Sequence, residues 1–175
     1  MDYKIAVCDD SQADRDYVAS LVRRWASEGD RTAHIEAFSS AEGFLFHYAE
    51  ESDFDILLLD IEMGGMDGVT MAKRLRQSND TVQIIFITGY SDYIAEGYEV
   101  AALHYLVKPL DENKLFSVLN RAAEKLQKNE KVLHLELSGE MVRLPVHRIR
   151  WAQVSGNYVT VHALQDYTVK MTLGQ

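Results

Sequence analysis

The chain has 175 residues, of which 47% are hydrophobic, and a formal net charge of −9 at pH 7. This length allows one large domain or two small ones, each with a real core. No apolar run approaches the roughly 18 residues that a membrane helix needs, and the start of the chain does not resemble a signal peptide. The single cysteine, Cys8, cannot form an internal disulfide. We therefore expect a cytoplasmic protein without a membrane partner.

Charge is divided unevenly along the chain. Residues 131–175 contain five basic and three acidic side chains, a net charge of +2, which leaves −11 for residues 1–130. An acidic front part can hold a cation, whereas a mildly basic tail can tolerate phosphates. The asymmetry predicts two units with different partners.

Five short apolar runs, each followed by a helical pattern, alternate along the first 128 residues. The expected strands are residues 3–8, 32–38, 55–60, 82–88 and 104–107. Residues 56–59 are all apolar, which is typical of a central strand buried on both faces of a parallel sheet. Five strand–helix pairs predict an α/β fold with a five-stranded, doubly wound parallel sheet and right-handed crossovers.

Polar residues mark where the helices begin. Ser11 with Asp14, and Ser39 with Glu42, have the spacing of helix-capping pairs. Further helices are expected near residues 69–75, over residues 92–100, and from 111 to 126, because apolar residues recur there at helical spacing.

Beyond the charged segment 127–131 the helical pattern disappears. Residues 132–137 and 141–146 flank a turn at Ser138–Gly139–Glu140 and predict a β-hairpin. Further short strands are expected at residues 149–154, 158–164 and 167–173. The end of the chain therefore reads as a partial, small all-β unit.

Polar residues stand at the carboxyl ends of four of the five expected parallel strands. They are Asp9 and Asp10, Asp60, Thr88, and Lys108. In open α/β sheets ligands bind at this edge. Three carboxylates in one cleft repel one another unless a cation lies between them, and an all-oxygen set suits Mg²⁺. Each residue alone also fits a turn, a cap or a strand end, but together they describe a carboxylate that accepts a phosphoryl group, next to a lysine and a hydroxyl that bind an anion.

These motifs, in this order, resemble a response-regulator receiver domain over residues 1–128, which implies a flavodoxin-like fold. The motifs are Asp9–Asp10, Leu58–Met63, Met66–Asp67–Gly68, Ile87–Thr88–Gly89 and Tyr105–Pro109. The resemblance implies that Asp60 takes a phosphoryl group from a sensor histidine kinase. It also implies that Asp10 and Asp60 ligate Mg²⁺ directly, that Asp9 does so mostly through water, and that the backbone carbonyl of Glu62 is a further ligand.

The resemblance assigns the remaining roles as well. Thr88 and Lys108 would hold the phosphoryl oxygens, and Tyr105 would be the switch aromatic whose rotamer follows Thr88. The Lys108–Pro109 bond is expected to be cis. Gly64–Gly65 stands where relatives usually have Pro-Gly, which is expected to loosen that loop.

After a linker at residues 129–131, residues 132–175 resemble the start of a LytTR DNA-binding domain. Carried over from that family, Asn157 and Tyr158 would offer hydrogen bonds to DNA, and Arg148 and Lys170 would contact phosphate. A complete domain of this family is about twice as long, so we expect unpaired sheet edges that pair with another copy or another chain, or a partly disordered fragment. We do not expect this chain alone to bind DNA competently.

The sequence thus predicts a two-component response regulator of the LytTR class. Phosphorylation of Asp60 would switch dimerisation through the fourth helix and fifth strand, and thereby transcription. Such a protein is a phosphoacceptor and catalyses only its own phosphotransfer and dephosphorylation.

Two alternative functions compete with this prediction. One is a phosphohydrolase with an aspartyl nucleophile, which needs a second aspartate where Glu62 stands. The other is a signalling adaptor that does not bind DNA.

Overall fold

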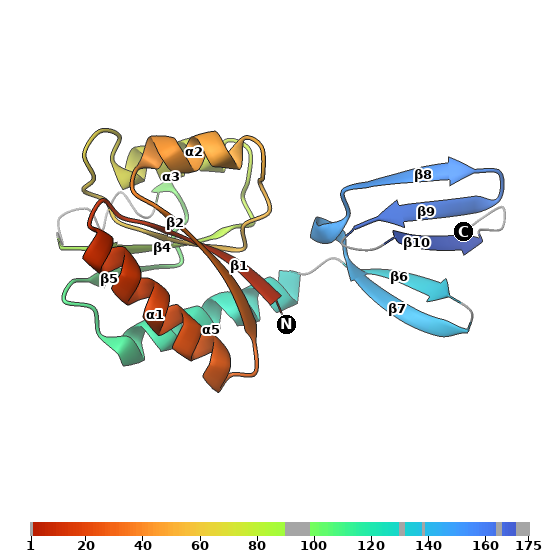
Figure 1. The fold of residues 1–175 in the computed structure, drawn as a ribbon, viewed down its shortest axis with the longest axis horizontal. Helices are drawn as coiled ribbons and strands as arrows, with labels where there is room; N and C mark the ends of the chain where they lie inside the picture. Colours follow the sequence, from red (N-terminus) through yellow and green to blue (C-terminus); the bar gives the residue numbers. More distant parts are fainter. Residues whose placement is uncertain (1, 90–98, 130–131, 138, 164–165, 171–175) are drawn as a thin grey trace. The chain divides into compact units, whose positions relative to one another are not determined.

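The computed structural model describes residues 2–89, 99–129, 132–137, 139–163 and 166–170, and these divide into two compact units, 1–126 and 127–175. The first unit is an α/β layer structure, and the second consists of short antiparallel strands (Figure 1). Of the described helices, none is long and apolar enough to cross a membrane.

The first unit is built on a five-stranded parallel sheet in the order β2-β1-β3-β4-β5. Its strands are β1 (Asp2–Cys8), β2 (Thr32–Phe38), β3 (Ile56–Leu59), β4 (Gln83–Thr88) and β5 (His104–Val107). The predicted doubly wound sheet is confirmed, and β3 lies at its centre. All four residues of β3 are buried, which explains why its sequence is apolar throughout.

Helices cover both faces of this sheet (Figure 1). They are α1 (Gln12–Glu28), α2 (Ala41–Tyr48), α3 (Gly68–Arg76) and α5 (Glu112–Asn129). Helices α1 and α5 lie on one face, and α2 and α3 lie on the other. The helix expected over residues 92–100 falls mostly outside the described residues.

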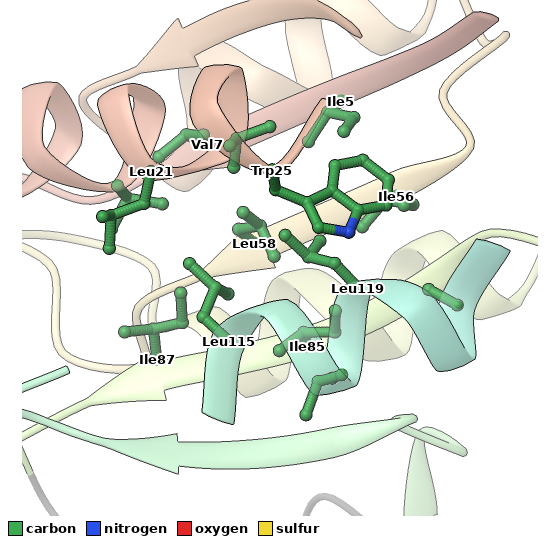
Figure 2. Packing of buried hydrophobic residues seen from close by; sticks show 14 of the residues in the cluster. Ile5, Val7, Leu21, Trp25, Ile56, Leu58, Ile85, Ile87, Leu115 and Leu119 are labelled. Carbon is green, nitrogen blue, oxygen red and sulfur yellow. The ribbon is translucent and has the colours of Figure 1, made fainter. Parts of the chain in front are cut away.

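Large apolar side chains fill the layer between the sheet and helices α1 and α5. Figure 2 shows Trp25 of α1 and Leu115 and Leu119 of α5 packed over Ile56 and Leu58 of β3. The Trp25 indole N–H also donates a 2.9 Å hydrogen bond to the side chain of Asn120, so the two helices are joined by a polar contact at the edge of the core. This packing fixes the central strand from one side.

The capping residues predicted from the sequence are correct for α1 and wrong by one residue for α2. Ser11 caps α1 as predicted, because its hydroxyl accepts a hydrogen bond from the Asp14 amide. The predicted cap of α2 at Ser39 is wrong by one residue, since Ser40 caps this helix and accepts from the Gly43 amide at 3.1 Å. Glu42, expected to complete that cap, instead accepts a hydrogen bond from the Met66 amide.

The second unit contains two small antiparallel sheets. Its elements are β6 (Val132–Leu137), β7 (Glu140–Pro145), a short 3₁₀ helix (Val146–Arg148), β8 (Trp151–Ser155), β9 (Tyr158–His162) and β10 (Asp166–Lys170). Strands β6 and β7 form the predicted hairpin, and the other three pair in the order β10-β9-β8. A small core of Leu135, Leu144 and Val161 joins the sheets. The strand expected from residue 149 begins only at Trp151, because the 3₁₀ turn comes first.

Gly68 is the point at which α3 meets the end of β3. A Cβ atom at this position would lie 2.1 Å from the backbone oxygen of Asp60, a distance that no side chain can occupy. The Gly68 amide also donates to the Ile61 carbonyl at 2.8 Å. Close approach, rather than an unusual backbone angle, therefore requires glycine here.

We predict that Gly68→Ala lowers the free energy of unfolding by about 2 kcal/mol, because the chain carrying Asp60 must shift to admit the methyl group. Gly64→Ala is the matched control in the same loop: a Cβ there meets nothing within 4 Å, so its effect should stay within about 0.5 kcal/mol. Urea denaturation of both variants makes the comparison. Equal losses would show that the contact at Gly68 is not limiting.

Candidate functional site

The carboxyl ends of four neighbouring strands meet at one edge of the sheet. Asp9 and Asp10 follow β1, Asp60 follows β3, Thr88 ends β4, and Lys108 follows β5. The strand order places β1, β3, β4 and β5 side by side, so the structure brings together the residues that the sequence singled out. The Lys108–Pro109 peptide bond is cis, as expected.

Three carboxylates form the centre of this site. Asp9, Asp10 and Asp60 each offer an oxygen within 4.8 Å of the others. Asp9 and Asp60 are only 4% and 6% exposed, whereas Asp10 faces solvent. One oxygen of Asp9 accepts a 2.8 Å hydrogen bond from the Ser11 amide, while Oδ1 of Asp60 is buried without a hydrogen-bond partner in the described part of the chain. That orphaned oxygen is the atom most in need of a ligand.

Lys108 balances the charge of the carboxylates. Its Nζ atom lies 2.8 Å from Asp9 Oδ2, 2.8 Å from Asp14 Oδ2 and 3.3 Å from Asp60 Oδ2. An ammonium group has three N–H donors, so three carboxylates use its full capacity. The backbone of Lys108 is fixed as well, because its amide donates to the Thr88 carbonyl at 2.8 Å.

Burial and charge shift the pKa values of the two central groups. Burial raises the pKa of the Asp60 carboxyl; the positive charge of Lys108 opposes this shift, and the negative charge of Asp9 adds to it. Burial by itself would lower the pKa of Lys108, but hydrogen bonds to Asp14 and Asp9 and the charge of Asp60 raise it overall. The surroundings therefore favour the charged form of Lys108 and disfavour the ionised form of Asp60.

Thr88 and Tyr105 lie on adjacent strands next to this cluster. Thr88 is fully buried at the end of β4. Tyr105 is half-buried on β5, and its ring centroid lies 6.2 Å from that of Phe86. In the strand register Tyr105 pairs with Phe86, and Val107 pairs with Thr88. A movement of Thr88 can therefore affect the neighbouring strand β5.

Three further residues support the site, and sequence reasoning missed their roles. Asp14, read only as part of a helix start, is a partner of Lys108. The Arg15 guanidinium donates to the backbone oxygen of Asp9 at 2.6 Å. Glu42 accepts from the Met66 amide at 2.8 Å and thereby ties to α2 the loop that contains Gly65, whose φ is +105°. One signal was available for Asp14: it is the acidic residue in the first turn of the helix that follows Asp9 and Asp10.

The site suits a magnesium ion. Its available donors are carboxylate oxygens, which Mg²⁺ prefers, and one of them, Asp60 Oδ1, is buried and has no hydrogen-bond partner among the residues that the structure describes. Asp10 adds an exposed carboxylate on the solvent side. The carboxylate of Glu62, in contrast, does not belong to the group of acids that lie within 4.8 Å of one another.

A second group of metal-ligand type lies elsewhere in the first unit. Glu36, His47 and Glu51 offer atoms within 4.8 Å of one another. The Lys4 ammonium lies among these acids, 3.2 Å from Glu36 and 2.9 Å from Glu51, and it also contacts Asp53 at 2.8 Å. Because a lysine already neutralises this group, we interpret it as a structural ion-pair network that joins β1, β2 and the segment after α2.

The proposed DNA-contacting residues in the second unit are only partly brought together. Asn157 lies in the turn between β8 and β9, and Tyr158, which is 49% exposed, begins β9. Lys170 pairs with Tyr158 across β10 and β9, so these three residues share one end of the sheet. Arg148 precedes β8 and thus lies at the opposite end of that strand from Asn157.

We predict a stability effect from the buried charge of Asp60. Because its pKa is raised in the folded state, ionised Asp60 opposes folding at pH values above its folded pKa, and this penalty disappears as the pH falls through that pKa. Without divalent metal, Asp60→Asn should therefore raise the free energy of unfolding by about 1 kcal/mol at pH 8, with a smaller gain at pH 5.

The matched control is Glu62→Gln, which removes an exposed acid next to the same strand and should change stability by no more than about 0.5 kcal/mol. Denaturant melts at both pH values measure the difference. A gain for Asp60→Asn that is the same at pH 5 and pH 8 would contradict the electrostatic explanation.

Comparison with known proteins finds a family that matches most of this chain. Residues 5–120 match the model of the response regulator receiver domain. The chain is 29% identical over 181 residues to the sensory transduction protein LytT of Bacillus subtilis, covering 97% of this chain and 73% of that protein. It is 31% identical over 119 residues to the positive alginate biosynthesis regulatory protein of Pseudomonas aeruginosa, covering 68% of this chain and 46% of that protein.

Solved structures of receiver domains resemble the first unit in fold. The receiver domain of AraT, a response regulator from Geobacillus stearothermophilus, superimposes with a TM-score of 0.64 at 27% identity, covering 75% of this chain and all of that domain. The response regulatory domain of mrkE from Klebsiella pneumoniae has a TM-score of 0.64 at 20% identity, covering 72% and 99% of the two chains, a likeness that speaks for the fold alone.

Proposed function

Since the chain belongs to the response regulator receiver family and is a two-component response regulator of the LytTR type, we propose that Asp60 accepts a phosphoryl group from a sensor histidine kinase. The observation that carries this proposal is the position of Asp60 at the centre of the strand-end site. There its buried carboxylate lies beside Asp9 and 3.3 Å from the Lys108 ammonium. The chain thus acts as a signalling protein and promotes only its own phosphorylation and dephosphorylation.

The transfer needs a nucleophile and positive charge around it. One oxygen of the Asp60 carboxylate bonds to phosphorus as the bond between phosphorus and the kinase histidine nitrogen breaks. The electron pair of the broken bond stays on the imidazole, which is protonated to give neutral histidine. Lys108 and the Thr88 hydroxyl would bind the phosphoryl oxygens, because an ammonium and a hydroxyl stabilise the charge that gathers there.

The metal ligands in this proposal come from the same cluster. Asp10 and Asp60 would bind Mg²⁺ directly, Asp9 mostly through water, and Glu62 through its backbone carbonyl. The ion, when bound, neutralises charge on the carboxylates and on the phosphoryl oxygens. Asp9 is held ready for this role by the Ser11 amide and by Arg15, which anchors its backbone.

The signal would leave the site through Thr88 and Tyr105. A phosphoryl group that draws in the Thr88 hydroxyl would bias the rotamer of Tyr105 on the neighbouring strand and so shift an existing equilibrium between inactive and active states. Val107 is 46% exposed on β5, in keeping with a dimer that forms through this strand and the fourth helix. That helix lies mostly outside the described residues.

The output would be DNA binding by the LytTR unit, of which the last 44 residues of the chain, from 132 to 175, would be the first part. Asn157, Tyr158 and Lys170 share one end of the three-stranded sheet and combine hydrogen-bonding groups with a positive charge. This combination suits contact with phosphate and with base edges. Arg148 would contact DNA only if the binding surface extends to the opposite end of β8.

We predict that incubation with Mg²⁺ and acetyl phosphate adds one stable phosphoryl group to the chain. Intact-mass measurement should show the adduct, peptide mapping should place it on Asp60, and Asp60→Asn should show none. Fast turnover of phosphate esters without a lasting adduct would support the phosphohydrolase instead.

The same reaction tests the metal ligands. Asp10→Ala should abolish Mg²⁺ binding and phosphorylation, because it removes a carboxylate ligand. Glu62→Ala should retain both, since only its carbonyl is proposed to bind. Titration calorimetry with Mg²⁺ makes the comparison, and an equal loss in both variants would show that the ligand assignment is wrong.

The DNA-binding proposal predicts that Lys170→Met in the full-length protein weakens binding to a mixed-sequence duplex and reduces the salt dependence of the affinity by about one counterion. Arg143→Met, the control, removes an equal charge from the exposed face of β7 in the other sheet. Fluorescence anisotropy at several salt concentrations measures both. Equal weakening by the two variants would count against a specific contact at Lys170.

A further inference from the structure

Lys108 has one partner that the phosphorylation scheme does not use. Its ammonium is shared among Asp9, Asp60 and Asp14, and the distance to Asp14 Oδ2, 2.8 Å, is as short as the distance to Asp9. Asp14 lies in the first turn of α1, and its backbone amide is held by the hydroxyl of Ser11. Its carboxylate is therefore presented to Lys108 by a capped helix.

The three partners differ in how easily they can release the lysine. Asp9 is buried and also bound to the Ser11 amide, and Asp60 is buried at the centre of the site. The side chain of Asp14, in contrast, is 43% exposed. Water can solvate this carboxylate after the lysine leaves, whereas a buried carboxylate that loses its cation is left poorly solvated. Asp14 is thus the partner that Lys108 gives up at least cost.

A phosphoryl group on Asp60 would require such a release. All three N–H donors of Lys108 are engaged by carboxylates, so binding a phosphoryl oxygen means that one existing contact must be broken or shared. The charge of Asp14 also repels a doubly charged phosphoryl group nearby. Through both effects Asp14 would raise the free energy of the phosphorylated state.

We propose that Asp14 is a positioning residue that holds Lys108 while Asp60 is unmodified and competes with the phosphoryl group for its ammonium. This inference rests on the proposed phosphorylation of Asp60. Asp14 thereby tunes how strongly the site favours the phosphorylated form, and the tuning comes from a helix that supplies none of the proposed metal ligands.

Beryllofluoride, a phosphoryl analogue that attaches to an aspartate in the presence of Mg²⁺, provides the test. At saturating Mg²⁺, Asp14→Asn should bind beryllofluoride about fivefold more tightly than the unaltered chain, as a contact of roughly 1 kcal/mol implies. Fluorine NMR of the bound analogue measures the affinity. Asp14→Glu, which restores a carboxylate, should return the affinity toward the original value.

Asp16→Asn is the matched control. Asp16 lies on the same helix with an exposed side chain, so its loss changes the net charge equally. The proposal expects a change of less than about twofold in this variant, because exposed charges beyond contact distance are screened by salt. Equal tightening in both variants would overturn it, since a general field effect would then suffice.

A purely structural role for Asp14 has a different signature. In that case Asp14→Asn would lower the free energy of unfolding and leave beryllofluoride affinity unchanged or weaker, which also overturns the proposal. Failure of the proposed function is distinguishable, because then the unaltered chain would bind no beryllofluoride and take no phosphoryl group from acetyl phosphate.

Discussion

The site depends on the ion pairs between the Lys108 ammonium and the carboxylates around it. Asp9 and Asp60 are buried carboxylates within a few ångströms of each other, and without a cation their repulsion and desolvation would oppose the fold. Lys108 reaches both and also Asp14, which explains why its pKa is raised although burial opposes that shift. In the proposed function the same ammonium would also bind the phosphoryl group. One cation would then have two uses, and the carboxylates around it would set the balance between them.

The fold makes these ion pairs possible because Asp9, Asp60 and Lys108 directly follow strands of the sheet. The all-apolar strand β3 is packed on both faces, with α1 and α5 on one side and α2 and α3 on the other, so Asp60 directly follows a fully buried strand. The Asp60 amide donates a 2.8 Å hydrogen bond to the Cys8 carbonyl, which aligns Asp60 with Asp9 at the ends of the adjacent strands β3 and β1. Gly68 then lets α3 pass close to the Asp60 backbone. Packing of this kind fixes the position of the Asp60 carboxylate, as the proposed attack on a phosphoryl group would require.

Much of this could be predicted from the sequence, for a physical reason. Strand period and parallel topology determine where Asp9, Asp60 and Lys108 lie, since each is the first residue after a strand of the parallel sheet. Contacts that depend on side-chain reach from a helix could not be predicted in the same way. Asp14 and Glu42 both look like capping residues, yet one contacts Lys108 and the other contacts the Met66 amide. The cap of α2 at Ser40 shows the same limit, because the capping-pair spacing favours Ser39 with Glu42, whereas Ser40 accepts from the Gly43 amide without an acidic partner three residues later.

The most direct test of this account is the stability of Lys108→Met, which keeps most of the length of the side chain and removes its charge. In metal-free buffer we expect the free energy of unfolding to fall by about 2 kcal/mol, since the carboxylates lose their cation. Added Mg²⁺ should then stabilise this variant more than it stabilises the unaltered chain, because binding to the folded state alone raises stability and the site has become more negative. Unchanged stability, with the same response to Mg²⁺ in both proteins, would contradict the claim that Lys108 balances the charge of this site.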